Sequence, residues 1–244
     1  MLVHGMLGLT QVFVQRLRWV DYFNQIPGWL RASGNEVHLV EVPGLASVAR
    51  RANVLMEQLG RAVGTRPVHL IAHSMGGLDA RHMITHLDMA TRVLSLTTIG
   101  TPHRGSPVAD WAVAQARRTG VFRLLELSPV DQQAFLDLCT QPCAAFNLAT
   151  PDAAGVRYFS IAGDAARDHT LLPLRLCHDL VREREGANDG LVSVASAGWG
   201  ERCAEWAADH VQQIGWHCEG PSGFDWRGAY AALLQRLQAT DPSD

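Results

Sequence analysis

One short stretch constrains the fold more than any other part of the 244-residue chain. The apolar run at residues 68–72 has the length of a buried strand, and Ser74 follows it between small residues. Ala72 precedes Ser74 by two positions and Gly76 follows it by two, in the small-x-Ser-x-Gly form of a sharp strand-to-helix turn. The turn crowds both flanking positions, so their side chains must be small. The pattern predicts a nucleophile elbow with Ser74 at its apex, and an ordinary turn with a capping serine is the alternative.

Apolar positions divide most of the chain into alternating strands and helices. Short apolar runs predict buried strands at residues 1–3, 37–42, 68–73, 93–99 and 156–162. Helical spacing of apolar residues predicts helices at residues 27–33, 47–63, 78–87 and 226–237, with Ser47 as the N-cap of the second. Strands that are apolar on both faces and alternate with helices indicate the α/β class, with a parallel sheet covered on both sides.

Residues 107–150 interrupt this alternation, because they are helical in composition and supply no strand. An insertion of this kind between two strands can cover a site, so we expect a lid or cap here. Residues 163–188 are expected to be irregular, with a solvated charge run at 182–185, and residues 193–200 form a polar, glycine-rich stretch. No repeat or linker divides the chain, so we expect a single domain over residues 1–244.

Charge and hydropathy exclude several classes of function. The formal net charge is −3, and the arginine pairs Arg50-Arg51 and Arg117-Arg118 are isolated, so nucleic-acid binding has no electrostatic support. No apolar run reaches the length of a membrane span. The first residues lack the basic and apolar regions of a signal peptide, which predicts a cytoplasmic protein as the sequence is written. A truncated N-terminus would allow a secreted or periplasmic one.

The five cysteines are scattered and odd in number, which is not the pattern of a disulfide framework. They are Cys139, Cys143, Cys177, Cys203 and Cys218. Free thiols are expected, and a bridge between Cys203 and Cys218 stays open as an alternative. Cys139 and Cys143 have no further cysteine or histidine at metal-ligand spacing, so no zinc site is expected.

A serine nucleophile needs a histidine to take its proton and a carboxylate to orient that histidine. Asp189 is the favoured acid, since it is followed by glycine and two branched apolar residues in a tight-turn pattern, and Asp164 is the alternative at the end of a strand. His210 is the favoured base, 21 residues after Asp189. His217 and His178 are weaker candidates. Ser74, Asp189 and His210 follow one another in the order that a serine–acid–histidine site on an α/β sheet requires.

Acyl transfer also requires N–H donors for the oxyanion that develops on the carbonyl oxygen. The backbone N–H of Met75, directly after the candidate nucleophile, is one expected donor. The backbone N–H of Met6 is the other, because the glycine-bearing loop at residues 4–8 follows the first strand. An ordinary strand-to-loop turn is the alternative for this loop.

With these residues in place, the chain resembles the bacterial true lipases, the triacylglycerol lipases of the α/β-hydrolase superfamily, nearly from end to end. Residues 2–8 resemble the oxyanion loop of that family, residues 21–31 the segment before its second strand, residues 72–77 its elbow, residues 100–106 the loop after the next strand, residues 188–192 its acid motif and residues 209–211 its histidine segment. The resemblance implies an α/β-hydrolase fold, a triad of Ser74, Asp189 and His210, and oxyanion donors at Met6 and Met75.

Departures from the family pattern are equally informative. The resemblance implies a calcium site with an aspartate two residues after the histidine, but the chain has Gln212 there, so we expect no calcium and no other cofactor. Ala195 stands where the family carries a disulfide cysteine. The region at 107–150 looks shorter than the lid of the secreted enzymes. These changes favour an esterase-like relative that works in another compartment over a secreted, interface-activated lipase.

The leading hypothesis is a serine carboxylic-ester hydrolase acting on lipid-like or medium-chain acyl esters, with residues 121–138 lining or covering the acyl site. The same triad could serve a thioesterase, an amidase or an acyltransferase, and the sequence does not separate these. A catalytically silent α/β-hydrolase that acts as a binding protein is the hypothesis from a different class.

Overall fold

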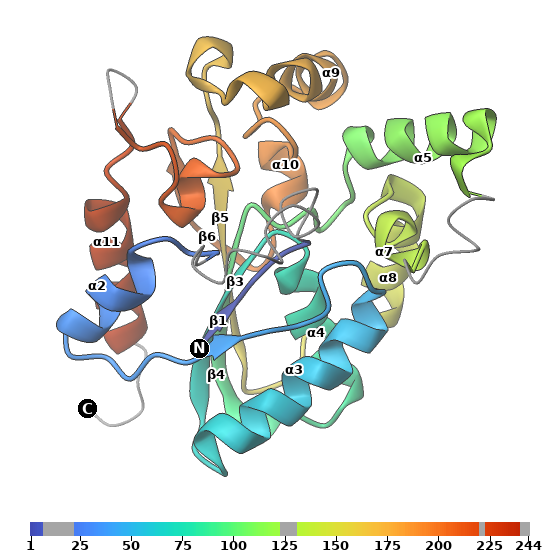
Figure 1. Ribbon diagram of the computed structural model, residues 1–244. Helices are drawn as coiled ribbons and strands as arrows, with labels where there is room; N and C mark the ends of the chain where they lie inside the picture. Colours follow the sequence, from blue (N-terminus) through green and yellow to red (C-terminus); the bar gives the residue numbers. More distant parts are fainter. Residues whose placement is uncertain (7–21, 123–130, 220–222, 240–244) are drawn as a thin grey trace, which may run out of the picture.

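The computed structural model describes residues 1–6, 22–122, 131–219 and 223–239. Six strands form one sheet in the order β2-β1-β3-β4-β5-β6, and each neighbouring pair is parallel (Figure 1). The strands are β1 Leu2–Val3, β2 Leu39–Val40, β3 Val68–His73, β4 Val93–Ile99, β5 Arg157–Gly163 and β6 Glu201–Trp206. The carboxyl ends of parallel strands meet at one edge of the sheet, and this edge carries the loops described below.

Helices cover both faces of the sheet, because successive strand residues point to opposite sides. Leu70 and Ala72 pack with α3 (Val48–Val63) and α4 (Gly76–His86) on one face. Ile71, between them in sequence, packs on the other face with α2 (Ile26–Ala32) and α11 (Trp226–Gln238). Figure 1 shows the two helix pairs on either side of the strands. The predicted two-sided parallel sheet is confirmed.

The insertion at residues 107–150 contributes α5 (Pro107–Thr119), α7 (Gln133–Leu136) and α8 (Thr140–Ala149). It is bonded to the body of the protein at several points. The carboxylates of Asp131 and Asp137 accept from the backbone N–H groups of Ser47 and Val48, at the N-terminus of α3. Ser47 is the N-cap residue of α3, as predicted, but its side chain makes no capping hydrogen bond, and aspartates from the insertion bind the N–H groups at this helix end instead. The interpretation of the insertion as a lid stays a prediction.

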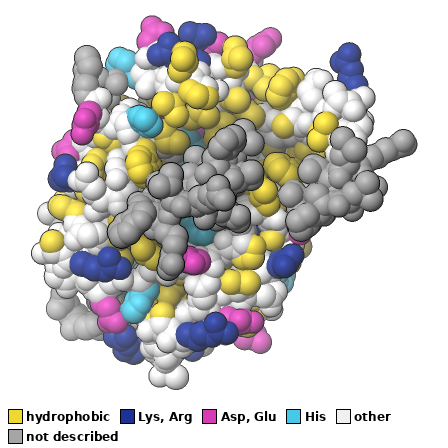
Figure 2. Space-filling view, viewed as in Figure 1, with side chains coloured by type: hydrophobic (Ala, Val, Ile, Leu, Met, Phe, Trp, Pro, Cys, Tyr) yellow, Lys and Arg dark blue, Asp and Glu magenta, His cyan; other side chains and the backbone are white. Residues whose placement is uncertain are grey.

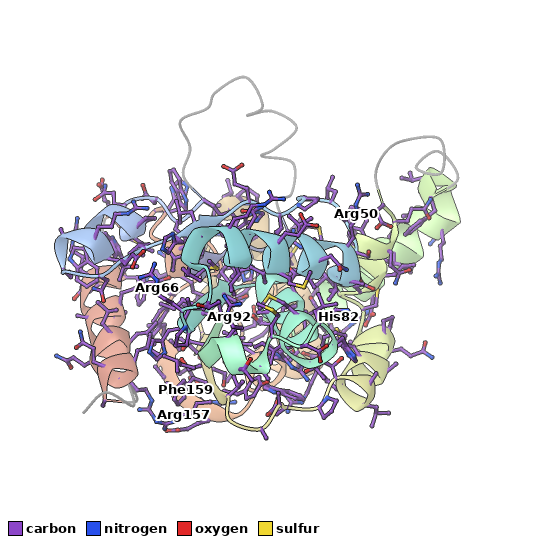
Figure 3. All side chains as sticks on the ribbon, turned by 90° about the horizontal axis from the view of Figure 1, so that it is seen from below. Arg50, Arg66, His82, Arg92, Arg157 and Phe159 are labelled. Atoms are coloured by element: carbon purple, nitrogen blue, oxygen red, sulfur yellow. The ribbon has the colours of Figure 1, made fainter. Side chains whose placement is uncertain are left out.

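A second contact joins the insertion to the body. His82 of α4, labelled in Figure 3, stacks on Phe146 of α8 with the ring centroids 6.4 Å apart. The part of the expected acyl-site segment at residues 123–130 lies outside the described residues.

The structure corrects two further expectations and adds a strand that was not predicted. The strand expected at residues 37–42 is only the two residues of β2. The region expected to be irregular at 163–188 contains η2 (Arg167–His169), η3 (Leu172–Leu174) and α9 (Arg175–Glu185). Helix α9 buries only His178 and Val181, so its apolar stripe was too thin to show a period. β6 follows the polar stretch that contains α10 (Val194–Ala197).

Two features bear on the predicted location of the protein: the state of its cysteines and the nature of its helices. All five cysteines have free thiols, so the alternative Cys203–Cys218 bridge is not formed. Within the ranges that the structure describes, no helix combines the length and the apolar character needed to cross a bilayer. The cytoplasmic location stays a prediction.

Candidate active site

Ser74 lies between β3 and α4 in a backbone conformation that few residues with a side chain adopt. Its φ is +56°, in the left-handed region, which costs about 1–2 kcal/mol for a residue with a Cβ. Hydrogen bonds hold it there, from the Ser74 N–H to the Ile99 carbonyl at 2.9 Å and from the Thr101 hydroxyl to the Ser74 carbonyl at 2.7 Å. A Cβ on Gly76 would lie 2.8 Å from the His4 carbonyl oxygen, which explains the small residue there. The turn has the strained geometry expected of a nucleophile elbow.

His210 and Asp189 form a buried hydrogen-bonded pair at the same edge of the sheet. Nδ1 of His210 lies 2.8 Å from Oδ2 of Asp189, and the His210 N–H donates to the Asp189 carbonyl at 2.8 Å. The second carboxylate oxygen accepts from the N–H groups of Leu191 at 2.9 Å and Val192 at 2.8 Å. Because a carboxylate oxygen accepts the Nδ1 proton, Nε2 of the neutral ring is left as the basic nitrogen.

The charge around His210 favours its protonated form. Burial lowers its pKa, but the charge of Asp189, the hydrogen bond to Asp189 and the charge of Asp209 together raise it above the usual 6.5. A histidine base with a carboxylate partner can hold a proton during a reaction and then release it. This is the electrostatic environment that the hypothesis of a serine nucleophile requires.

Ser74 and His210 line one cavity of about 350 Å³. Most of its remaining lining is apolar. The α5 residues are Val108, Ala109, Ala112, Val113 and Ala116, and the others include Val121, Phe122, Phe135, Leu138, Leu191 and Val192. Figure 2 shows hydrophobic side chains gathered in the upper part of the view, where α5 and α9 lie in Figure 1. The cavity suits an apolar chain attached to a group that reacts at Ser74.

The two expected oxyanion donors lie beside the elbow. The Met75 N–H is at the N-terminus of α4, where the first N–H groups have no partner within a helix. The loop with Met6 passes close to Ser74, since a Cβ on Gly5 would lie 2.6 Å from the Ser74 Cβ. His4 fixes this loop, because its Nε2 accepts from the Val42 N–H at 3.1 Å and its Nδ1–H then donates to the Gly5 carbonyl at 2.8 Å. The peptide bond between Gly5 and Met6 is trans, so its N–H, on Met6, points in the direction opposite to the Gly5 carbonyl.

The structure does not bring the alternative residues into this arrangement. Asp164 accepts from the Asn188 N–H at 3.2 Å instead of binding His210. His178 is buried in α9, with its Nε2 3.1 Å from the Ala165 carbonyl oxygen. His217 is exposed. Of the candidate acids and bases, Asp189 and His210 are therefore the pair that the structure joins beside Ser74.

Two buried glutamines follow His210, and the sequence analysis singled out only the first of them, Gln212. Gln212 occupies the position of the family's calcium aspartate, and its carboxamide accepts from the Asp209 N–H at 2.9 Å and donates to the His217 carbonyl at 3.2 Å. Gln213 donates to Oδ2 of Asp189 at 2.9 Å. Proximity to His210 was the only sequence signal for Gln213, and a lone amide side chain belongs to no motif.

Comparisons with known proteins identify the family of the chain. The family model described as "PGAP1-like alpha/beta domain" matches residues 48–182. The chain is 34% identical to Triacylglycerol lipase 2 of Saccharomyces cerevisiae over 210 residues, covering 81% of this chain and 63% of that protein. It is 30% identical to a triacylglycerol lipase of Vibrio cholerae over 251 residues, covering 87% of this chain and 78% of the relative. The chain belongs to a lipase family of the α/β-hydrolase superfamily.

The fold of this family is also seen in solved structures. A metagenomic carboxyl esterase superposes with a TM-score of 0.79 at 22% identity, over 98% of this chain and 74% of that one. The chain spans 63% of the length of the yeast relative. Membership in the lipase family and the likeness to this solved structure confirm the predicted α/β-hydrolase fold.

Proposed function

We propose that this chain is a serine carboxylic-ester hydrolase that cleaves apolar acyl esters through an acyl-enzyme on Ser74. One observation carries the proposal: a strained serine and a carboxylate-bound histidine, Ser74 and His210, line the same apolar cavity. A nucleophile, a base and an acyl pocket are three of the parts that acyl transfer needs.

In the first half of the reaction, Nε2 of His210 takes the proton of the Ser74 hydroxyl while Oγ attacks the ester carbonyl carbon. Asp189 keeps Nδ1 protonated and stabilises the imidazolium that forms. The imidazolium then gives its proton to the departing alcohol, which leaves the acyl group on Ser74. In the second half, a water loses its proton to His210, attacks the acyl-enzyme, and releases the acid with the proton returned to Ser74.

The carbonyl oxygen gains negative charge in both halves. We assign the Met6 and Met75 N–H groups as its donors, supported by the closeness of the residue 4–6 loop to Ser74 and by the position of Met75 at a helix N-terminus. The helix terminus adds a favourable electrostatic potential for an anion.

Substrate preference follows from the lining of the cavity. Apart from Ser74, Ser106 and His210, the lining side chains are apolar, so an acyl chain would be buried there without unpaired charge. A cavity of about 350 Å³ supports a medium-length acyl group as the preferred substrate. The five α5 residues form one wall of this acyl site.

We also propose that activity needs no calcium. Calcium prefers several charged oxygen ligands, and the neutral Gln212 carboxamide is already held by Asp209 and His217. Both oxygens of Asp209 accept backbone N–H groups, Oδ2 from Leu171 and Oδ1 from Val211 and Gln212. Chelation should leave the turnover of a p-nitrophenyl ester and the melting temperature unchanged, and a clear loss that added calcium restores would refute this.

A panel of p-nitrophenyl esters of graded acyl length tests the function and the pocket together. Wild type should turn over these esters with an optimum at intermediate length. Ser74→Ala should lose this activity while keeping its melting temperature, and Ser33→Ala, an exposed serine on the α2 side, should keep both. Turnover that survives in Ser74→Ala would refute the proposal. A folded wild type that turns over acyl thioesters or transfers acyl groups, but hydrolyses no ester, would favour the alternatives.

A further inference from the structure

The side chain of Gln213 occupies a space that two glycines leave open. Gln213 is fully buried in η4 (Gln212–Ile214), and its backbone carbonyl accepts from the Tyr230 hydroxyl at 3.0 Å. A Cβ on Gly100, after β4, would lie 2.3 Å from the Gln213 Oε1, and a Cβ on Gly163, at the end of β5, would lie 2.1 Å from its Nε2. An alanine at either glycine would displace the carboxamide, so the ends of both strands are shaped around it.

The carboxamide is directed at the candidate catalytic acid. Its Nε2 donates to Oδ2 of Asp189 at 2.9 Å, and the same oxygen binds Nδ1 of His210 at 2.8 Å. Oδ2 therefore divides its acceptor capacity between an amide and the imidazole. The other oxygen is occupied by the Leu191 and Val192 N–H groups, so Gln213 is the side-chain group that competes with His210 for the carboxylate.

We propose that Gln213 is a positioning residue of the catalytic acid, which holds Asp189 by Oδ2 and limits how strongly that carboxylate binds the Nδ1 proton of His210. This inference rests on the proposed function. A base must accept a proton from serine and give it up again within one turnover. By sharing Oδ2, Gln213 prevents His210 from holding its proton too tightly while keeping the ring in position.

The other groups around the pair define what a pH measurement will report. Asp209 is the second carboxylate near His210, from the same loop. The ring of His73, in β3, contacts the ring of His210, with their centroids 4.5 Å apart. Nδ1 of His73 lies 2.7 Å from the Tyr22 hydroxyl. Burial, and then the nearby His210, hold the pKa of His73 well below 6.5, so His73 is neutral where His210 titrates.

Gln213 also faces His73. Nε2 of His73 and Oε1 of Gln213 are both buried, and neither has a well-aligned partner among the described residues. The two side chains are nevertheless close enough for Gln213 to favour the protonated form of His73 against the larger effect of burial. The carboxamide therefore lies between the acid and the histidine that precedes the nucleophile.

The test is the pKa of His210 in three forms of the full chain, measured by NMR of ¹³C-histidine-labelled protein, with His210→Gln to assign the signal. Gln213→Leu removes the competing donor and should raise the His210 pKa by about half a unit to one unit. Gln213→Glu keeps the shape of the side chain and places a second carboxylate beside Asp189, so it should raise that pKa further. The acidic limb of kcat/KM against pH should move in the same order.

Gln212→Leu is the matched control, since Gln212 is an equally buried amide in the same turn that bonds Asp209 and His217 instead of Asp189. It should lower the melting temperature and leave the pKa of His210 in place. A His210 pKa that coincides in wild type, Gln213→Leu and Gln213→Glu would overturn the proposal and leave Gln213 a packing residue. If Gln213→Leu does not fold, an unchanged His210 pKa in Gln213→Glu, which also lacks the amide donor, still overturns the proposal. The NMR pKa requires no turnover, so this result is separate from any failure of the proposed ester hydrolysis.

Discussion

The cavity has a polar side around His210 and an apolar side along α5, and the two differ in how their side chains are fixed. On the polar side, Asp189 and His210 are joined by a hydrogen bond and Gln213 is bonded to the same carboxylate. On the apolar side, Ala109, Ala112 and Ala116 present only methyl groups to the cavity. Hydrogen-bond geometry is strict, whereas apolar packing changes gradually with volume. The polar side should therefore set whether the reaction proceeds, and the apolar side which chain it accepts.

The largest effect is expected at the acid. Asp189→Asn removes the charge that stabilises the imidazolium and allows the wrong tautomer of His210, so kcat should fall by about 10⁴-fold. The measurement is the steady-state hydrolysis of the best p-nitrophenyl ester. Asp164→Asn is the control, and it should lose little because the Asp164 carboxylate accepts from the Asn188 N–H and, among the described residues, makes no hydrogen bond to His210. Equal losses in the two variants would mean that the polar side is assigned to the wrong carboxylate.

A smaller loss is expected at the oxyanion loop. Gly5→Ala places a Cβ 2.6 Å from the Ser74 Cβ and 2.8 Å from the Tyr22 hydroxyl, so the loop must move and the Met6 N–H with it. Loss of one oxyanion donor should reduce kcat by about 10²-fold with little change in KM. Gly60→Ala, in α3 with no atom near its added methyl group, should keep full activity and raise the melting temperature slightly. Full activity in Gly5→Ala would remove this loop from the site.

The apolar side should respond by specificity instead. Ala112→Phe fills part of the cavity, so kcat/KM for long-chain esters should fall by about tenfold while short-chain esters are unaffected. Ala114→Phe, on an exposed position of the same helix outside the cavity lining, should keep the wild-type preference. A uniform loss for all chain lengths in Ala112→Phe would show that α5 does not form the acyl wall.

The smallest effect concerns stability in acid, which again distinguishes the polar side. Burial lowers the pKa of His4 to about 4 and holds that of His73 well below 6.5. Below pH 6.5 the unfolded chain therefore binds protons at these two histidines that the folded chain does not bind. Their contribution to the free energy of unfolding is lost as pH falls. His210, with a raised pKa, acts in the opposite direction: its contribution is full below 6.5 and is lost as pH rises.

Two other buried groups shift in the same pH range and oppose each other: burial lowers the pKa of His103, and burial raises the pKa of Asp79 to about 7. The effect of His4 and His73 then exceeds that of His210, so the free energy of unfolding in urea should drop between pH 7 and pH 5 by about 1–2 kcal/mol. His73→Gln should show a smaller drop than wild type. The same drop in both would assign the acid sensitivity to other groups, away from the polar side.

Much of the fold was readable from local patterns. The apolar runs at β3, β4 and β5 are buried on both faces, and the stripe on α11 is regular, so these elements were predicted close to their bounds. β6 was not, because Glu201, Arg202 and Glu205 give an edge strand the composition of a loop. The capping of α3 by Asp131 and Asp137 depends on contacts 84 and 89 residues away, which no local pattern encodes.

The site divides in the same way. Ser74 could be predicted from the steric demands of its turn, and Asp189 and His210 from the chemistry and chain order that a serine nucleophile requires. Gln213 could not, because its role depends on the space left at Gly100 and Gly163, which only the folded sheet reveals.

The most direct test of the central claim is to identify the residue that reacts as the nucleophile. The folded protein is treated with a fluorophosphonate, and the adduct is located by mass spectrometry of its peptides. The proposed mechanism predicts one adduct, on Ser74. This adduct should be absent in Ser74→Ala, and it should form much more slowly in His210→Ala. An unlabelled wild type, or an adduct on another residue with Ser74 unmodified, would contradict it.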